Sequence, residues 1–330
     1  MATRSMSPRL MMTKPLWYPV GLAVALLCVQ FAARTTAELF LVALMAIYAL
    51  AALGLNIIFG VAGLLSVAQA AVMAFGGYTS ALLMVRLDFS FLAALPAAAV
   101  ASALLSAFAG LAALRVGSHY FILVTLGVAE AALLVMINEE QLTGGYNGLV
   151  GIPPLSLAGV DMSSSDAVAT VSIVALFIGW YVANAMRASR FGSGAAAAGA
   201  DPQLAMACGV DVPRQRVLAS AAGGAFAGVA GALFAEALQF LGPGDFGVDK
   251  ALLLLLIVVI GGAGSNGGTV LAAIMLTYLS QGLLTLTTVG PLVYGLGIMV
   301  ILVFVPRGLA GLAGTGRRVV AAIARRERRQ

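Results

Sequence analysis

The sequence predicts an all-α integral membrane protein with about ten transmembrane helices, some of them broken by glycine, and with both termini in the cytoplasm. Of its 330 residues, 62% are hydrophobic and only 9% are charged, and the mean hydropathy is +1.05. A water-soluble domain usually carries about 25% charged residues, so there is too little polar surface here to cover a globule. Many apolar runs reach the roughly 20 residues that a helix needs to cross a bilayer. The short alternating segments of an outer-membrane barrel are absent from the sequence.

The first apolar run, residues 16–33, follows the basic residues Arg4, Arg9 and Lys14. A basic start before an apolar stretch also fits a cleaved signal peptide. The run is long for such a peptide, however, and many further apolar runs follow it. We therefore expect a short cytoplasmic tail, residues 1–15, and then a first transmembrane helix.

Further apolar runs predict the remaining transmembrane helices. They cover residues 38–59, 67–85, 91–114, 120–137, 167–186, 217–240, 251–263, 269–286 and 291–305. An even number of helices places both termini on the same side of the membrane. We expect one transmembrane domain over residues 16–312 and a basic cytoplasmic tail over residues 313–330.

The basic residues predict the orientation. If the N-terminus is cytoplasmic, only Arg34, Arg86 and Lys250 of the 18 Lys and Arg lie outside, which leaves 15 on the inside. This asymmetry agrees with the positive-inside rule. The segment 138–166 has no Lys or Arg and is expected outside. Basic residues in loops and at the tail indicate contact with anionic membrane lipid and no nucleic-acid surface.

Two Gly-rich regions depart from plain apolar helix. Asn56–Tyr78 contains four glycines together with the polar residues Asn56, Ser66 and Gln69, and Gly261–Gly268 begins with two glycines, Gly261 and Gly262. A broken helix at membrane depth is tolerated where its backbone is buried in protein or lines a cavity, and such breaks often mark a transport path. Alternatively, single glycines merely let helices approach closely.

The segment 187–216, expected on the cytoplasmic side, is too long for a minimal connection between two helices. Its centre can form a short helix, with Asp201 as the cap and Pro202 in the first turn. A short helix lying across the cytoplasmic face suits the docking of a soluble partner. An ordinary connecting loop is the alternative.

Catalysis by this chain alone is not expected. The only lysines are Lys14 and Lys250, and neither follows a phosphate-binding loop. The single His119 and the two cysteines, Cys28 and Cys208, have no partners at metal-ligand spacing. The sequence therefore predicts no cofactor and no metal on this chain, and any use of ATP requires a separate subunit.

Two acidic residues fall within the expected membrane spans, Glu130 and Glu236. A charge at mid-bilayer costs about 2.5–3.5 kcal/mol on insertion scales, so such a group usually faces a cavity or a partner. Glu130 lies near the middle of its helix, where it could hydrogen-bond a substrate ammonium group, fix a neighbouring broken helix, or simply remain protonated. Glu236 lies closer to the outer end of its helix, where its carboxyl group could reach water.

Five segments resemble the permease subunits of branched-chain amino acid ABC importers, and the M-type permease in particular. They are ALGLNIIFGVAGLLSVAQAAVMAFGGYTSALL at 52–83, YFILVTLGVAEAALL at 120–134, LTGGYNGLVGIPP at 142–154, VVIGGAGSNGGTVLAAI at 258–274 and GLGIMVILVFVPRGLAGL at 295–312. Their order and spacing hold over about residues 40–312. The importers of urea and short-chain amides use closely similar subunits.

The resemblance implies a permease domain over residues 16–312 in a bacterial inner membrane, with a periplasmic loop at 138–166 and a coupling loop at 187–216. It also implies a second permease subunit, two cytoplasmic ABC ATPases that use the ATP, and a periplasmic substrate-binding protein. From the Gly-rich breaks and the intramembrane acid, rather than from the resemblance, we expect the substrate path near Asn56, Ser66, Gln69, Glu130, Gly261 and Gly262.

The sequence departs from the family pattern in two places. Gln69 stands where a histidine is common, so a proton-dependent role at that position is not expected. In the coupling loop, Ala205 and Gly209 stand at the family's Ala and Gly positions. Pro202, which follows Asp201, stands at a position where the family usually has an acidic residue. The charged contacts of this loop with an ATPase must therefore differ from those of the family.

We expect the substrate to be a small zwitterion with an aliphatic side chain, because free backbone amides at Gly-rich breaks can bind a carboxylate. Urea or a short amide is the first alternative. A self-sufficient secondary transporter is a second alternative, and it predicts uptake without an ATPase. A membrane-embedded enzyme would need clustered ionisable groups, which the two acidic residues do not supply.

Overall fold

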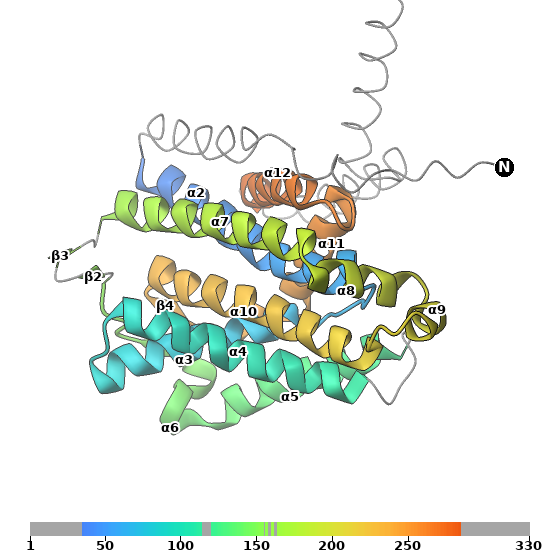
Figure 1. Cartoon of the computed structure of the whole chain (residues 1–330). Helices are drawn as coiled ribbons and strands as arrows, with labels where there is room; N and C mark the ends of the chain where they lie inside the picture. The colour runs from blue at the N-terminus through green and yellow to red at the C-terminus, as the bar shows by residue number, and fades with distance from the viewer. Residues whose placement is uncertain (1–34, 114–119, 155, 158–159, 162–163, 285–330) are drawn as a thin grey trace, which may run out of the picture.

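The computed structural model describes residues 35–113, 120–154, 156–157, 160–161 and 164–284 as a bundle of long helices (Figure 1). Its helices are α2 (Thr36–Leu55), α3 (Gln69–Leu87), α4 (Phe91–Ala113), α5 (Phe121–Asn138), α6 (Glu140–Thr143), α7 (Ser165–Ala188), α8 (Arg190–Ala200), α9 (Pro202–Ala207), α10 (Val212–Leu238), α11 (Val248–Gly261) and α12 (Asn266–Leu284). Each helix expected between residues 38 and 286 has a counterpart among them. The helices expected at 16–33 and 291–305 and both tails lie outside the described residues.

Within the described residues, six helices are long and apolar enough to cross a membrane: α2 with its continuation to Val61, α3, α4, α5, α7 and α10. Helix α11 is shorter, at 14 residues. The chain is thus a helical, multi-pass membrane protein.

Helices α2 and α10 form the centre of the bundle. In the apolar window of α2, 94% of the residues are buried inside the protein, and α10 packs against α2, α3 and α4. Glycines allow these close contacts: a Cβ atom on Gly54 of α2 would lie 2.5 Å from the carbonyl oxygen of Gly223 in α10. Small residues at such crossings let the backbones of membrane helices approach each other.

The chain leaves regular helix between α2 and α3, within the region where the sequence predicts a break. A π-helical turn, η2 (Asn56–Val61), follows α2, and an irregular segment over residues 62–68 precedes α3. Gly63 adopts a φ of 69°, in the left-handed region that glycine enters without a steric penalty. The second Gly-rich region is the tight turn between α11 and α12.

Four two-residue strands were not expected from the sequence. The strand β1 (Leu149–Val150) pairs antiparallel with β4 (Phe240–Leu241), which joins the loop after α5 to the loop after α10. The strand β2 (Ser156–Leu157) pairs antiparallel with β3 (Val160–Asp161). In Figure 1, β2 and β3 lie at one end of the bundle, and α8 and α9 lie at the other.

The segment 187–216 contains two helices where the sequence predicts one. Besides α9, the stretch RFGSGAAAAGA forms α8, which begins after Ser189. The Ser189 hydroxyl oxygen accepts a hydrogen bond from the Gly192 amide at 3.4 Å. Alanine, which fills five of the 11 positions, has the highest helix propensity of any residue. Helix α10 also begins five residues earlier than expected, at Val212, because Asp211 caps it and Pro213 fits its first turn.

Candidate functional site

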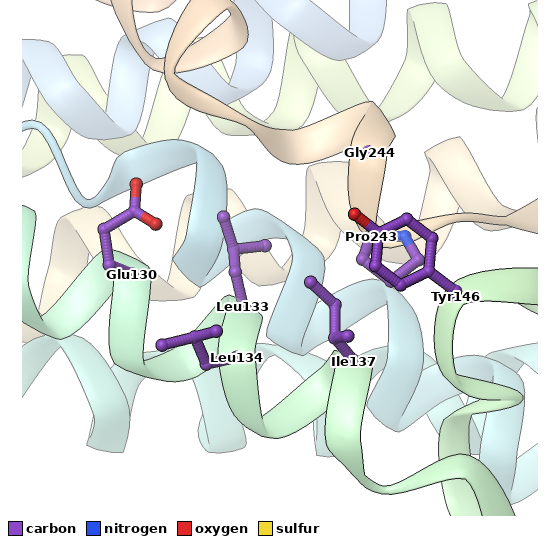
Figure 2. A pocket seen from close by; sticks show the side chains of 7 residues that line it. All are labelled: Glu130, Leu133, Leu134, Ile137, Tyr146, Pro243 and Gly244. Carbon is purple, nitrogen blue, oxygen red and sulfur yellow. The ribbon is translucent and has the colours of Figure 1, made fainter.

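A cavity of about 160 Å³ lies beside the second half of α5. Its lining comes from α5, from η3 (Gly145–Asn147) and from η4 (Pro243–Phe246). The lining residues are Glu130, Leu133, Leu134, Ile137, Tyr146, Pro243 and Gly244. Figure 2 shows the Glu130 carboxyl group at one end of the row of α5 side chains, and Tyr146 beside Pro243 at the other end.

Helix periodicity places these α5 side chains together. Positions 130, 133, 134 and 137 recur at three- and four-residue spacing and therefore share one helix face. Leu134 is 55% exposed on that face in this chain. The cavity thus joins one carboxyl group to aliphatic walls. A void of about 150 Å³ accepts a benzene-sized molecule, so this cavity suits a small aliphatic molecule that carries a hydrogen-bond donor.

A much narrower cleft, of about 10 Å³, continues from Glu130 between α5, the start of α3 and the start of α11. Its lining includes Val67, Ala70 and Ala251. This volume is about that of one water molecule, so the cleft is closed to an amino acid. The Val67 amide donates a hydrogen bond to Thr125 Oγ1 at 3.2 Å, which holds α5 against the irregular segment 62–68.

The two Gly-rich regions meet at a chain of amide hydrogen bonds. The Gly264 amide donates to Asn56 Oδ1 at 2.8 Å, and Asn56 Nδ2 donates to Asn266 Oδ1 at 2.8 Å. Asn266 Nδ2 then donates to Asn184 Oδ1 of α7 at 3.1 Å. Asn56 and Asn266 are buried, with 0% and 4% of their surfaces exposed. The amide chain therefore fastens η2 to the α11–α12 turn and to α7.

The other polar residues expected along the substrate path have partners within the protein. Gln69 Nε2 donates to the carbonyl oxygens of Ala51 at 3.2 Å and Gly223 at 3.0 Å, which ties α3 to α2 and α10. Ser66 is buried, and its hydroxyl oxygen accepts a hydrogen bond from the Ala68 amide at 3.3 Å.

The expected glycines of the path lie where α11 ends. Gly261 is the last residue of α11, and a Cβ atom there would lie 2.6 Å from the backbone of Thr269. Gly262 has a φ of 92°. Of the six residues expected along the path, the structure places Glu130 at the cavity and the other five in helix contacts and the two breaks.

Glu236 is buried, with 2% of its surface exposed, so the expectation that its carboxyl group reaches water is wrong. Neither carboxyl oxygen has a hydrogen-bond partner within the described part of the chain. Helix α10, which carries Glu236, packs against α2, α3 and α4.

The residues expected in the coupling loop shape α9. Asp201 Oδ1 accepts hydrogen bonds from the Gln203 and Leu204 amides, both at 3.0 Å, and Gly209 has a φ of 83° in the turn that follows. Pro202 occupies the first turn. Ala205 is buried against Ala198 and Val212, together with neighbouring apolar residues. These residues fix the shape of the segment.

Two large apolar side chains of α9 are exposed, one on each side of the buried Ala205. Leu204 is 62% exposed and Met206 is 52% exposed. Exposed apolar side chains on a short, well-capped helix offer contact area that water covers poorly. Neither residue was predicted from the sequence; the available signal was a large apolar side chain on each side of Ala205.

The contacts of Thr125, Asn184 and Asn266 were not predicted from the sequence either. Asparagine within an apolar helix is a usable signal, because polar groups at membrane depth need partners. Among the described residues, no group of His, Cys, Asp and Glu could hold a metal ion.

Comparison with known proteins assigns the chain to a family. Residues 38–306 match the family described as branched-chain amino acid transport system / permease component. The chain is 30% identical over 287 residues to the high-affinity branched-chain amino acid transport system permease protein LivM of Escherichia coli (strain K12). It is 28% identical over 287 residues to the LivM protein of Salmonella typhimurium (strain LT2). Each match covers 80% of this chain and 67% of the relative. No solved structure matches the chain. With four fifths of its length aligned to these permeases, the chain belongs to the family of branched-chain amino acid transport system permease components.

Proposed function

We propose that this chain is the membrane-spanning permease subunit of an ATP-driven importer, and that it translocates branched-chain amino acids across a bacterial inner membrane. The observation that carries the proposal is the cavity at Glu130, which combines one carboxyl group with aliphatic walls. A carboxylate accepts strong hydrogen bonds from an ammonium group, and Leu133, Leu134 and Ile137 suit an aliphatic side chain. The family match supports the same class of substrate.

The orientation follows from the basic residues at the α8–α9 end. Arg187, Arg190, Arg214 and Arg216 cluster there in the sequence, so this end is cytoplasmic under the positive-inside rule. The cavity and the β1–β4 pair then face the periplasm, where a substrate-binding protein delivers the amino acid. Ten helices, with the N- and C-termini in the cytoplasm, complete this topology.

Two exposed surfaces of the chain suit contact with partner subunits. A charged group facing lipid at mid-bilayer is costly, so the exposed face of α5 around Glu130 suits contact with a second permease subunit. The exposed apolar side chains of α9, Leu204 and Met206, suit a groove on one of two cytoplasmic ABC ATPases. The permease itself binds no cofactor, and ATP is hydrolysed on these partner subunits.

The test is uptake of radiolabelled leucine into proteoliposomes. They contain this chain with its neighbouring-gene permease, ATPases and binding protein, with or without internal ATP. We expect ATP-dependent leucine uptake. Uptake of urea instead of leucine would support the assignment as an importer and would change the assigned substrate. Leucine uptake by this chain alone, with no dependence on ATP, would contradict the proposed importer.

Glu130 is tested in the same system. Glu130→Gln removes the charge with little change in shape, and we expect leucine uptake to fall at least about ten-fold because the ammonium group loses a charge-assisted partner. Glu139→Gln, at the exposed end of α5 and outside the cavity lining, is the matched control. Equal uptake by the two variants at equal membrane abundance would reduce Glu130 to a packing role.

A further inference from the structure

The backbone of α8 touches the break between α2 and α3 directly. A Cβ atom on Gly199 would lie 2.8 Å from the carbonyl carbon of Ala62, 2.9 Å from its oxygen and 3.0 Å from the Gly63 nitrogen. In the reverse direction, a Cβ atom on Gly63 would lie 3.0 Å from Gly199 Cα. No side chain separates the two segments at this point, so a displacement of one backbone is passed directly to the other.

The break is fixed at one end. Asn56 begins η2 and is held by the amide chain to Gly264, Asn266 and Asn184. The Gly63 backbone, by contrast, lies at the surface of the bundle against α8. The backbone amides of Ala62, Gly63 and Leu64 donate hydrogen bonds to carbonyl oxygens of η2, so a displacement at Gly63 acts on a segment whose start is held.

Val67, near the other end of the break, lies beside the closed cleft. The Val67 amide donates to Thr125 Oγ1 of α5, and Val67 lines the cleft that continues from Glu130. The contacts thus run from α9 through α8 and Gly199 to segment 62–68, and from there to α5. This route joins the cytoplasmic tip to the helix that carries Glu130.

We propose that Gly199 is a positioning residue for transport. Through its backbone contact with Ala62 and Gly63, α8 holds segment 62–68 so that α5 closes the cleft, and movement of α8 and α9 by the ATPase opens it. This inference rests on the proposed function, because it requires an ATPase to act on α9.

The contact of Gly199 with Ala62 and Gly63 is called the joint below. Gly199→Ala tests it in the full assembly of both permeases, both ATPases and the binding protein. The added methyl group forces α8 away from backbone atoms that have no side-chain freedom to yield. We expect normal assembly and basal ATP hydrolysis, and at least about a five-fold fall in leucine transported per ATP hydrolysed. This ratio responds to coupling, whereas a loss of folded protein lowers both rates together.

Gly194→Ala on the same helix is the matched control. Its Cβ atom would meet the end of the flexible Gln215 side chain, which can move aside. We expect its transport per ATP to equal that of the wild type. The same result for Gly199→Ala would overturn the proposal.

A second measurement needs no substitution in the joint. Amide hydrogen exchange of the wild-type assembly is compared with and without a non-hydrolysable ATP analogue. We expect the analogue to change exchange in both α8 and residues 62–68. A change in α8 with none at 62–68 would overturn the joint. Absence of ATP-dependent uptake by the wild-type assembly would instead contradict the proposed function, so the two failures can be told apart.

Discussion

At the scale of single residues, buried amides fix the irregular parts of the chain. Asn56 both donates and accepts within the amide chain, and with 0% exposure it has no access to water as a substitute partner. Asn266 links it to Asn184, at the exposed end of that chain. One backbone group of the α11–α12 break, the Gly264 amide, thereby gains a side-chain acceptor.

Asn266→Ala leaves Asn56 Nδ2 buried without an acceptor. Leaving a buried polar group unpaired costs about 1–3 kcal/mol, so we expect a lower unfolding temperature for the purified protein in detergent at a fixed scan rate. Asn138→Ala is the control, because Asn138 is exposed and its amide donates to Leu134 O within its own helix. Equal shifts in the two variants would show that the amide chain does not stabilise the fold.

At the scale of elements, α9 shows how a short helix separates structural from contact positions. Ala205 points into the α8–α9–α10 contact, while Leu204 and Met206 point outward. A bulky substitution at Ala205 therefore disturbs the packing of the segment itself. The two outward side chains can be changed without entering that contact.

Leu204→Asp combined with Met206→Asp is expected to release the ATPases. Two carboxylates would have to be desolvated in the apolar contact, which strongly disfavours docking. The measurement is co-purification of the ATPases with the permease pair. Gln203→Asp on the same helix, which is exposed and already polar, is expected to leave the complex intact. ATPases that remain bound to the double variant would refute this docking surface.

The sequence predicted the helices between residues 38 and 286 because each long span is an apolar run of membrane length. It did not predict α8, whose Gly- and Ala-rich stretch has no such run, nor the two-residue strands, which are too short to show alternation. At the candidate site, the cost of an intramembrane charge pointed to Glu130. The partners of Asn56 and Gln69 could not be predicted, because they lie 210 and 154 residues away in the chain.

At the scale of the whole molecule, the two ends of the bundle differ in chemistry. The end with α8 and α9 carries arginines and an exposed cysteine, Cys208. The opposite end carries the β1–β4 pair and Tyr146, which is 85% exposed. If the chain has one orientation in the membrane, a reagent that cannot cross the bilayer reaches one end from one side and the other end only from the opposite side.

Labelling with a membrane-impermeant maleimide tests this orientation. In a Cys28→Ser background, we expect Cys208 to react in inside-out vesicles and not in right-side-out vesicles. Tyr146→Cys, in a background that also carries Cys208→Ser, should react in right-side-out vesicles only, because charged reagents do not cross the bilayer. Reaction of both positions from the same side would contradict the topology.

The hydrogen bond between Asn56 and Asn266 also sets an order for biogenesis. The two residues are separated by 210 positions, and at about 5–20 residues per second this separation corresponds to roughly 10–40 s of translation. During that interval α2 has been synthesised, but Asn266, which accepts the hydrogen bond from Asn56 at the end of α2, has not. The nascent protein must therefore keep the end of α2 solvated or shielded until α12 leaves the ribosome. A chain that stops before α12 would display an unpaired amide that quality-control proteases could recognise as unfinished.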